Sequence, residues 1–165
     1  MEMILTVMAD DKTGIVENIS DIVASEKGNW LDSRLAHMSG KFAGIIKINC
    51  VDSNVEQLKA KLSNLKNDGI LIQCEMAQTT QKDLTGIKIE ITSHDRKGIV
   101  KEVTTTLAGL RVNILELHTR CYQAPMSAEV MFGAVLDLQM PQGIDFESVE
   151  TALEALSSEL MVDEI

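Results

Sequence analysis

The sequence predicts an α+β protein built from two copies of one βαββαβ unit, and three observations support this. The motif Asp-Lys-Thr-Gly-Ile-Val at residues 11–16 returns as Asp-Arg-Lys-Gly-Ile-Val at residues 95–100, so that Gly98 lies 98 − 14 = 84 positions after Gly14. Each motif follows a short apolar run and precedes an amphipathic helical pattern. An ungapped overlay of residues 7–34 on 91–118 gives seven identities: Asp11/Asp95, Gly14/Gly98, Ile15/Ile99, Val16/Val100, Ala24/Ala108, Asn29/Asn113 and Leu31/Leu115.

The first copy covers residues 1–77. After its motif, apolar residues at steps of 0, 1, 4, 7 and 8 predict one buried helical stripe formed by Ile15, Val16, Ile19, Ile22 and Val23. Gly28 is placed to end that helix in the left-handed conformation. The predicted elements are a strand at 3–8, a helix at 14–27, a hairpin of strands at 30–38 and 42–51, a helix at 55–65 and a strand at 70–77.

The second copy covers residues 87–165, after a polar linker at 78–86 that lacks periodicity. Its last helix carries apolar residues at steps of 0, 3, 7 and 10, as the second helix of the first copy does. The order βαββαβ in each copy predicts a ferredoxin-like arrangement, with two helices on one face of a four-stranded antiparallel sheet. The other face and the edge strands need cover, so pairing of the units and a homodimer are expected. The predicted elements are strands at 87–92, 114–122, 129–140 and 161–165, and helices at 99–110 and 146–156.

Composition narrows the classes of function. The net charge of −10 and the aromatic content of 3% disfavour direct nucleic-acid binding, which depends on Lys and Arg against phosphates. The cysteines Cys50, Cys74 and Cys121 are odd in number and have no CxxC spacing, so neither a disulfide framework nor a zinc site is predicted. No signal pattern or apolar run of transmembrane length is present, and a cytoplasmic protein without membrane association is expected.

The sequence offers no recognisable catalytic arrangement. His37, His94 and His118 stand in no triad order, and no metalloprotease or P-loop motif occurs. A small hydrolase on this fold would use a glycine-rich phosphate loop with an arginine, whereas each turn here has one glycine and only the second has Arg96. We therefore expect no catalytic residues, no metal and no cofactor.

The two glycine turns are the more informative candidates. Backbone N–H groups at Gly14–Ile15 and Gly98–Ile99 start a helix without intrahelical acceptors, and with the positive helix end they suit a carboxylate. Glycine lets a ligand approach the backbone closely. Asp11 and Asp95 could accept from a ligand's ammonium group or could instead cap the helix, a common role of aspartate.

Asn29 and Asn113 occupy the same position in the two copies. A side-chain amide both donates and accepts hydrogen bonds, which suits a zwitterionic ligand. The alternative is that each is a turn residue in left-handed geometry before its strand. The occurrence of glycine turn and asparagine in both copies favours the ligand-binding interpretation.

The pattern Asp-x-x-Gly-Ile-Val, followed fifteen residues after the glycine by an asparagine at a strand start, resembles the ACT domain. The resemblance covers nearly the whole chain in two copies and implies paired βαββαβ modules that sense amino acids. Residues 29–42, above all Asp-Ser-Arg-Leu-Ala at 32–36, resemble the glycine cleavage system transcriptional repressor family. The ACT turn commonly reads Asp-Arg-Pro-Gly, and this chain has Lys12-Thr13 and Arg96-Lys97 in place of Arg-Pro.

The resemblance implies a non-enzymatic regulator that binds a small amino acid, glycine or serine for example, and acts through a protein partner such as a transcriptional activator. It would regulate glycine cleavage without binding DNA itself. The alternative is a regulatory subunit or interaction module of an enzyme of amino-acid or one-carbon metabolism.

Overall fold

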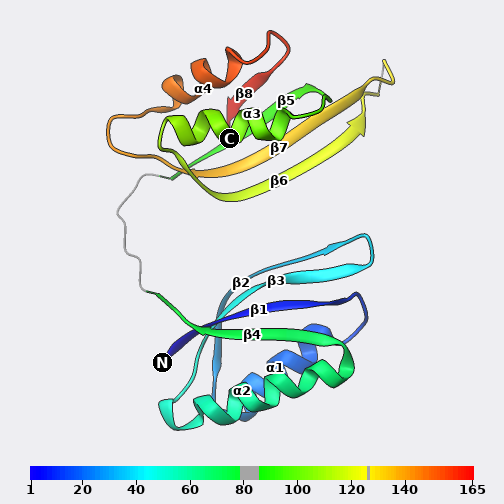
Figure 1. Cartoon of the computed structure of the whole chain (residues 1–165), viewed down its shortest axis with the longest axis vertical. Coiled ribbons are helices and arrows are strands. Elements are labelled where there is room, and N and C mark those ends of the chain that lie inside the picture. The colour runs from blue at the N-terminus through cyan, green and yellow to red at the C-terminus, as the bar shows by residue number, and fades with distance from the viewer. Residues whose placement is uncertain (79–85, 126) are drawn as a thin grey trace. The chain divides into compact units, whose positions relative to one another are not determined.

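The structure is a computed structural model that describes residues 1–78, 86–125 and 127–165. The chain forms two compact units, one containing β1 to β4 and the other β5 to β8 (Figure 1). Most of the predicted linker, residues 79–85, lies outside the described residues, and Gly86 already belongs to β5.

In the first unit, two helices cover one face of a single antiparallel sheet. The strands lie in the order β2-β3-β1-β4, which places β1 in the centre beside β3 and β4. Short 3-10 segments flank the second helix at Asp52–Asn54 and Leu65–Asp68. The elements are β1 (Glu2–Asp10), α1 (Ile15–Ser25), β2 (Asn29–Met38), β3 (Lys41–Asn49), α2 (Val55–Asn64) and β4 (Ile70–Met76).

The second unit repeats this architecture with the strand order β6-β7-β5-β8. Helices α1 and α3 both have 11 residues and begin 99 − 15 = 84 positions apart. The register of β2 shifts between Trp30 and Asp32, and that of β6 shifts at the matching place. The predicted α+β fold with two ferredoxin-like units is confirmed. The elements are β5 (Gly86–His94), α3 (Ile99–Gly109), β6 (Asn113–Gln123), β7 (Val130–Gln139), α4 (Phe146–Glu154) and β8 (Met161–Glu164).

Each unit has its own apolar core between the sheet and the helices. Alternate residues of β1 are buried because successive side chains of a strand point to opposite faces. The predicted stripe on α1 is narrower than expected, since Val16 is 42% exposed and Ile22 is only partly buried. Val100 is likewise 40% exposed in the second unit. The side chains that fill the core from β1 and α1 are Met3, Leu5, Val7, Ala9, Ile15, Ile19 and Val23.

The end of α1 corrects the expectation for Gly28. The left-handed residue is Lys27, with φ of 57°, and its counterpart in the second unit is Arg111, with φ of 59°. Gly28 is needed for space, because a Cβ there would lie 2.8 Å from Cγ1 of Val23 and 3.1 Å from the backbone oxygen of Asn49. The glycine therefore permits the start of β2 to pass close to α1 and β3.

The uncovered sheet faces of the two units differ in polarity. The first exposes large apolar side chains on β1, β3 and the edge strand β4, with Met8 57%, Ile45 50% and Leu71 49% exposed. In the second unit the same face is mostly polar. Its side chains include Glu90, Thr92, His118 and Arg120.

Among residues 1–78, 86–125 and 127–165, no helix combines the length and the apolar character needed to cross a membrane.

Candidate functional site

The two glycine turns have nearly the same backbone geometry. Gly14 has φ of 91° and ψ of 2°, and Gly98 has φ of 90° and ψ of −1°. Each immediately precedes the first residue of its helix, and its carbonyl oxygen accepts from the backbone N–H of Asn18 at 2.9 Å or of Glu102 at 3.0 Å. The next N–H groups have no intrahelical acceptor in an α-helix, but that of Ile99 donates to the backbone oxygen of Arg96 at 3.4 Å. Both turns lie at the positive end of a helix, and the second has one of its backbone donors already engaged.

The first turn is held by contacts to distant segments. The backbone N–H of Asp11 donates to the oxygen of Gly40 at 2.9 Å, which joins the turn to the β2–β3 hairpin. The ammonium group of Lys12 donates to the backbone oxygen of Asp68. The carboxylate of Asp11 lies 3.5 Å from Nε2 of His37.

The second turn is held by a bidentate ion pair. The guanidinium of Arg96 donates to both carboxylate oxygens of Glu102, at 2.8 and 2.6 Å. These hydrogen bonds lower the pKa of Glu102, and the pair ties the turn to the first turn of α3. The backbone N–H of Asp95 donates to the oxygen of Val130 at 2.9 Å, as Asp11 does to Gly40. The ion pair thus links Arg96 of the turn to the helix that follows it.

The capping role considered for Asp11 and Asp95 is wrong. No side-chain hydrogen bond caps α1 or α3, because a left-handed glycine is the residue before each helix. Asp11 instead faces His37, and the carboxylate of Asp95 lies against the thiol of Cys121. The pKa of that thiol is raised by desolvation and then by the negative charge and hydrogen bond of Asp95.

Asn29 and Asn113 lie far from the turns of their own units. Each is the first residue of its strand, opposite Asn49 in β3 or Gln139 in β7. The glycine turn follows the other end of the sheet, where the register pairs the last residues of β1 and β2 with Lys41. Ten residues at about 3.3 Å each put roughly 30 Å between these ends. Within one unit, the structure therefore does not bring the glycine turn and the asparagine (Asn29 or Asn113) together.

The alternative that Asn29 and Asn113 are left-handed turn residues before their strands is also wrong. Neither has a positive φ, and the left-handed residues are Lys27 and Arg111, two positions earlier. Both asparagine side chains are exposed, and Nδ2 of Asn113 donates to Oε1 of Gln139 at 3.4 Å. The amides are thus open to a ligand or to another unit.

Comparison with known proteins adds to this geometry. A family model described as the ACT domain matches residues 2–75. Residues 2–75 are an ACT domain. The second unit repeats its element order, its sheet order and its glycine turn, so the chain carries two ferredoxin-like ACT units in tandem.

Relatives extend the likeness to the whole chain. The glycine cleavage system transcriptional repressor of Escherichia coli (strain K12) is 24% identical over 162 residues, which is 96% of this chain and 85% of the relative. The protein of the same name from Shigella flexneri matches with the same figures. A crystal structure of an unknown protein from Galdieria sulphuraria superposes with a TM-score of 0.81 and 25% identity, over 99% of this chain and 98% of that chain. The likeness to the repressors and the ACT fold identify a regulatory ACT protein.

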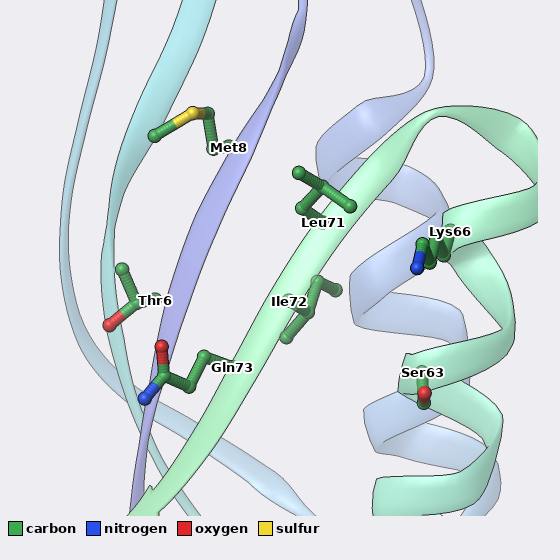
Figure 2. Close-up of a pocket in the computed structure, with 7 residues that line it drawn as sticks. All are labelled: Thr6, Met8, Ser63, Lys66, Leu71, Ile72 and Gln73. Atoms are coloured by element: carbon green, nitrogen blue, oxygen red, sulfur yellow. The ribbon is translucent and has the colours of Figure 1, made fainter.

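A hollow lies along the edge strand β4 of the first ACT unit and has a volume of about 290 Å³. Figure 2 shows Met8 and Leu71 beside each other on the sheet, with Ser63 and Lys66 on the helical side of β4. Sequence reasoning did not single out these residues, because only the pairing of β1 with β4 places them together. With Lys66 as its one charged lining residue, the hollow has no acidic group for an ammonium ion.

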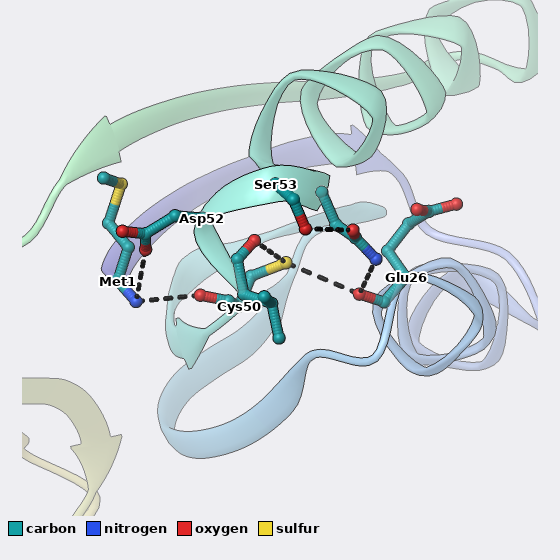
Figure 3. Close-up of polar contacts among 7 residues, drawn as sticks. Met1, Glu26, Cys50, Asp52 and Ser53 are labelled. Atoms are coloured by element: carbon teal, nitrogen blue, oxygen red, sulfur yellow. Dashed lines mark hydrogen bonds and ion pairs between the residues drawn. The ribbon is translucent and has the colours of Figure 1, made fainter.

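Near Asn29, the connection between α1 and β2 is fixed by a polar cluster (Figure 3). Glu26 is 3% exposed and its carboxylate pairs with Lys61 at 2.5 Å. Its backbone oxygen accepts from Nδ2 of Asn54 at 3.1 Å and from the thiol of Cys50 at 3.5 Å. The amino group of Met1 donates to the oxygen of Cys50 at 2.8 Å. These bonds satisfy the buried polar groups at the end of the sheet that carries Asn29.

The second ACT unit has a charged cluster that the first lacks. His94, the last residue of β5, contacts Glu159 through Nδ1 at 3.0 Å and Glu129 through Nε2 at 3.1 Å. Hydrogen bonds to the two carboxylates raise the pKa of His94. The matching residue of the first unit is Asp10, which pairs with Lys41. Among the described residues, no group of three His, Cys, Asp or Glu side chains is placed to hold a metal ion.

Proposed function

We propose that this protein is a non-enzymatic, amino-acid-responsive regulator that binds a small amino acid, glycine or serine for example, and passes this state to a protein partner. The observation that supports it most is the pair of glycine turns, which have matching backbone angles and stand directly before a helix in both units. A helix start with a left-handed glycine offers backbone donors to a carboxylate. The repressors to which the chain is similar support a regulatory role.

The ligand carboxylate would lie on the N–H groups of Gly14–Ile15 or Gly98–Ile99. Its ammonium group would lie near Asn29 or Asn113, whose side-chain oxygens accept hydrogen bonds. Because glycine turn and asparagine occupy opposite ends of one sheet, the asparagine would come from another unit of the same chain or of a homodimer. A ligand that binds one packing of units better than another would shift the equilibrium between them and so carry a signal.

The partner would be a protein, such as a transcriptional activator, and the regulated process would be glycine cleavage, as the name of the Escherichia coli relative states for that protein. The net charge of −10 argues against direct contact with DNA phosphates. We place the protein in the cytoplasm, with one ACT domain at 1–77 and the other at 87–165, the latter extended by Gly86 at the start of β5.

Thermal unfolding with millimolar glycine, serine and a panel of other amino acids tests this proposal. A ligand that binds only the native state adds RT ln(1 + [L]/Kd), about 2.7 kcal/mol at a hundredfold excess over Kd. The variants Asn29→Ala and Asn113→Ala should lose the shift, whereas Asn67→Ala, an exposed asparagine after α2, should keep it.

A folded protein whose melting temperature no amino acid changes would overturn the sensor role. Co-purification with an enzyme in that case would support the alternative of a regulatory subunit. A shift that survives both asparagine variants would remove Asn29 and Asn113 from the site.

A further inference from the structure

The free edge of β4 differs from the other edges of the two sheets. Strand β4 is the last strand of its sheet, and its register with β1 runs from Ile70 to Met76 without a shift. Edge strands are commonly protected from further pairing by lysine, proline, a bulge or short length. Strand β4 has seven residues and contains no lysine, arginine or proline. Its edge is therefore open to a further strand.

The other three edge strands carry such protection. The register of β2 shifts after Trp30, and that of β6 shifts after Ile114. Strand β8, the counterpart of β4 in the second unit, has only four residues, and two of them are the acidic Asp163 and Glu164. An unprotected edge thus occurs once in the part of the chain that the structure describes.

The hydrogen-bond pattern shows which backbone groups of β4 face the free edge. The N–H of Ala77 donates to the backbone oxygen of Glu2 at 3.1 Å, so these two residues form a hydrogen-bonded pair. Such pairs alternate along an antiparallel ladder, so the odd-numbered residues of β4 bond to β1. The N–H and C=O groups of Ile72, Cys74 and Met76 therefore point away from β1, and among the described residues no strand lies on that side of β4.

The hollow of about 290 Å³ along this edge reaches both sides of the strand. On the open face of the sheet it is lined by Met8 and Leu71, both exposed. On the helical side it is lined by Ser63 and Lys66, and Ile72 lies on that same side (Figure 2). A strand added to β4 would thus meet an apolar surface on one side and a polar, cationic surface on the other.

Two lysines give the helical side of the edge its charge. Among residues 1–78, 86–125 and 127–165, the ammonium group of Lys66 has no carboxylate partner. Burial raises the pKa of the Cys74 thiol, and the positive charge of Lys59 in α2 acts against this rise. Lys59 is itself paired with Glu56 at 3.0 Å. Because opposite charges on neighbouring strands attract, the unpaired Lys66 favours an acidic side chain beside it.

The register of an added antiparallel strand determines where its acidic residues would lie. The two residues of a hydrogen-bonded pair have their side chains on the same face of the sheet. A residue bonded to Ile72 or Cys74 would therefore direct its side chain toward the helical side and Lys66. The residues between would direct theirs to the open face, against Leu71 and Met8.

We propose that the free edge of β4 is a docking site for an extended segment of a protein partner, in which acidic residues alternate with apolar ones. Backbone hydrogen bonds would supply affinity, and the two unlike sides of the strand would supply the sequence preference. The site does not require that the glycine turns bind an amino acid.

The test is a titration of the ¹⁵N-labelled full chain with an end-blocked heptapeptide of alternating glutamate and valine. The peptide should slow solvent exchange of the Ile72 and Cys74 amides at least tenfold, because their N–H groups gain acceptors. Exchange at Gln73, which bonds to β1, and at Val162 in β8 should change less than twofold. A peptide of alternating lysine and valine should bind at least tenfold more weakly.

Two methylated peptides test the backbone pairing itself. Methyl groups on the glutamate nitrogens remove the donors that would face β4, and binding should be lost. Methyl groups on the valine nitrogens remove donors on the far edge of the added strand, and affinity should stay within threefold. An effect of the two peptides that is equal or reversed would overturn the antiparallel pairing.

Two variants with matched controls test the chain. Lys66→Glu should weaken the glutamate–valine peptide at least tenfold, whereas Lys101→Glu, the same charge change on an exposed position of α3, should not. Cys74→Pro removes one outward donor at a position where an edge strand tolerates proline, and it should abolish binding that Cys74→Ala retains. A well-dispersed spectrum of each variant shows that it is folded.

Three outcomes would overturn the proposal. The first is no added protection of Ile72 and Cys74 at millimolar peptide, and the second is unchanged affinity in Lys66→Glu. The third is protection of the same amides in the protein alone that rises with its concentration, which would assign the edge to a second copy of this chain.

Discussion

Replacement of Gly98 by alanine measures how much the left-handed backbone of the glycine turn contributes to the free energy of unfolding. Gly98 has φ of 90°, where an L-residue is strained. A Cβ built there meets no atom within 4 Å, so that steric overlap with neighbours adds nothing. The cost of Gly98→Ala is therefore that of the left-handed backbone, about 1–2 kcal/mol.

Gly109, the last residue of α3, provides a matched control. A Cβ there also meets no atom within 4 Å, but Gly109 is not among the residues with positive φ. Gly109→Ala should therefore stabilise the unit by about 0.4–1 kcal/mol, because alanine restricts the unfolded chain. The two variants of the same helix should differ by about 2 kcal/mol.

Urea unfolding followed by circular dichroism measures this difference. With a slope of about 1 kcal/mol per molar urea, typical of a small domain, the midpoints should lie about 2 M apart. The single tryptophan, Trp30, lies in the first unit, and its fluorescence should show an unchanged transition in both variants. Equal midpoints for Gly98→Ala and Gly109→Ala would refute the requirement for a left-handed residue at the turn.

Two further predictions concern strand packing and pH. Gly44→Ala should destabilise the first unit by more than about 3 kcal/mol, because the new Cβ would overlap a backbone oxygen of the neighbouring strand β2. Gly133→Ala should destabilise the second unit by less than about 1.5 kcal/mol, because only the edge of the Tyr122 ring, 3.3 Å away, must move. Equal shifts of the urea midpoint in the two variants would contradict this prediction. The pKa of His94 is raised by Glu129 and Glu159, so its stabilisation should be complete below the ordinary histidine value near 6.5 and be lost as pH rises through the higher folded pKa. Urea midpoints of the second unit between pH 5 and 9 should show this decline in the native chain and lack it in His94→Gln, and a decline of equal size in both would assign it to other groups.

The two ACT units share their backbone and differ in the charges around the turn. Unit one joins the end of β1 to β3 through an ion pair of Asp10 with Lys41. In unit two the same position is taken by His94, whose pKa is raised by hydrogen bonds to Glu129 and Glu159. The two turns thus share one backbone geometry and differ in the charged pairs beside them.

The fold and the glycine turns could be predicted from the sequence because their signals are local. The repeated motif, the apolar steps along each helix and the short polar connections each lie within one element, and they determine element type and order. A glycine between an apolar run and a helical pattern is likewise read from a few adjacent residues. The pattern around Gly28 nevertheless predicts the wrong left-handed residue, since Lys27 has the positive φ and Gly28 is required by its close packing against Val23.

Only the tertiary structure decided which of the candidate residues meet. The register of β2 against β3 placed Asn29 at the end of the sheet opposite its own glycine turn, although only fifteen residues separate Gly14 from Asn29 in the chain. The register of β1 and β4 brought Met8 and Leu71 to one hollow, although sixty-three positions separate them. Strand pairing depends on the packing of the whole sheet, and a shift of one residue would turn each side chain to the other face. The sequence of a single segment therefore determines what that segment becomes, and the assembled sheet determines which side chains it can combine into a site.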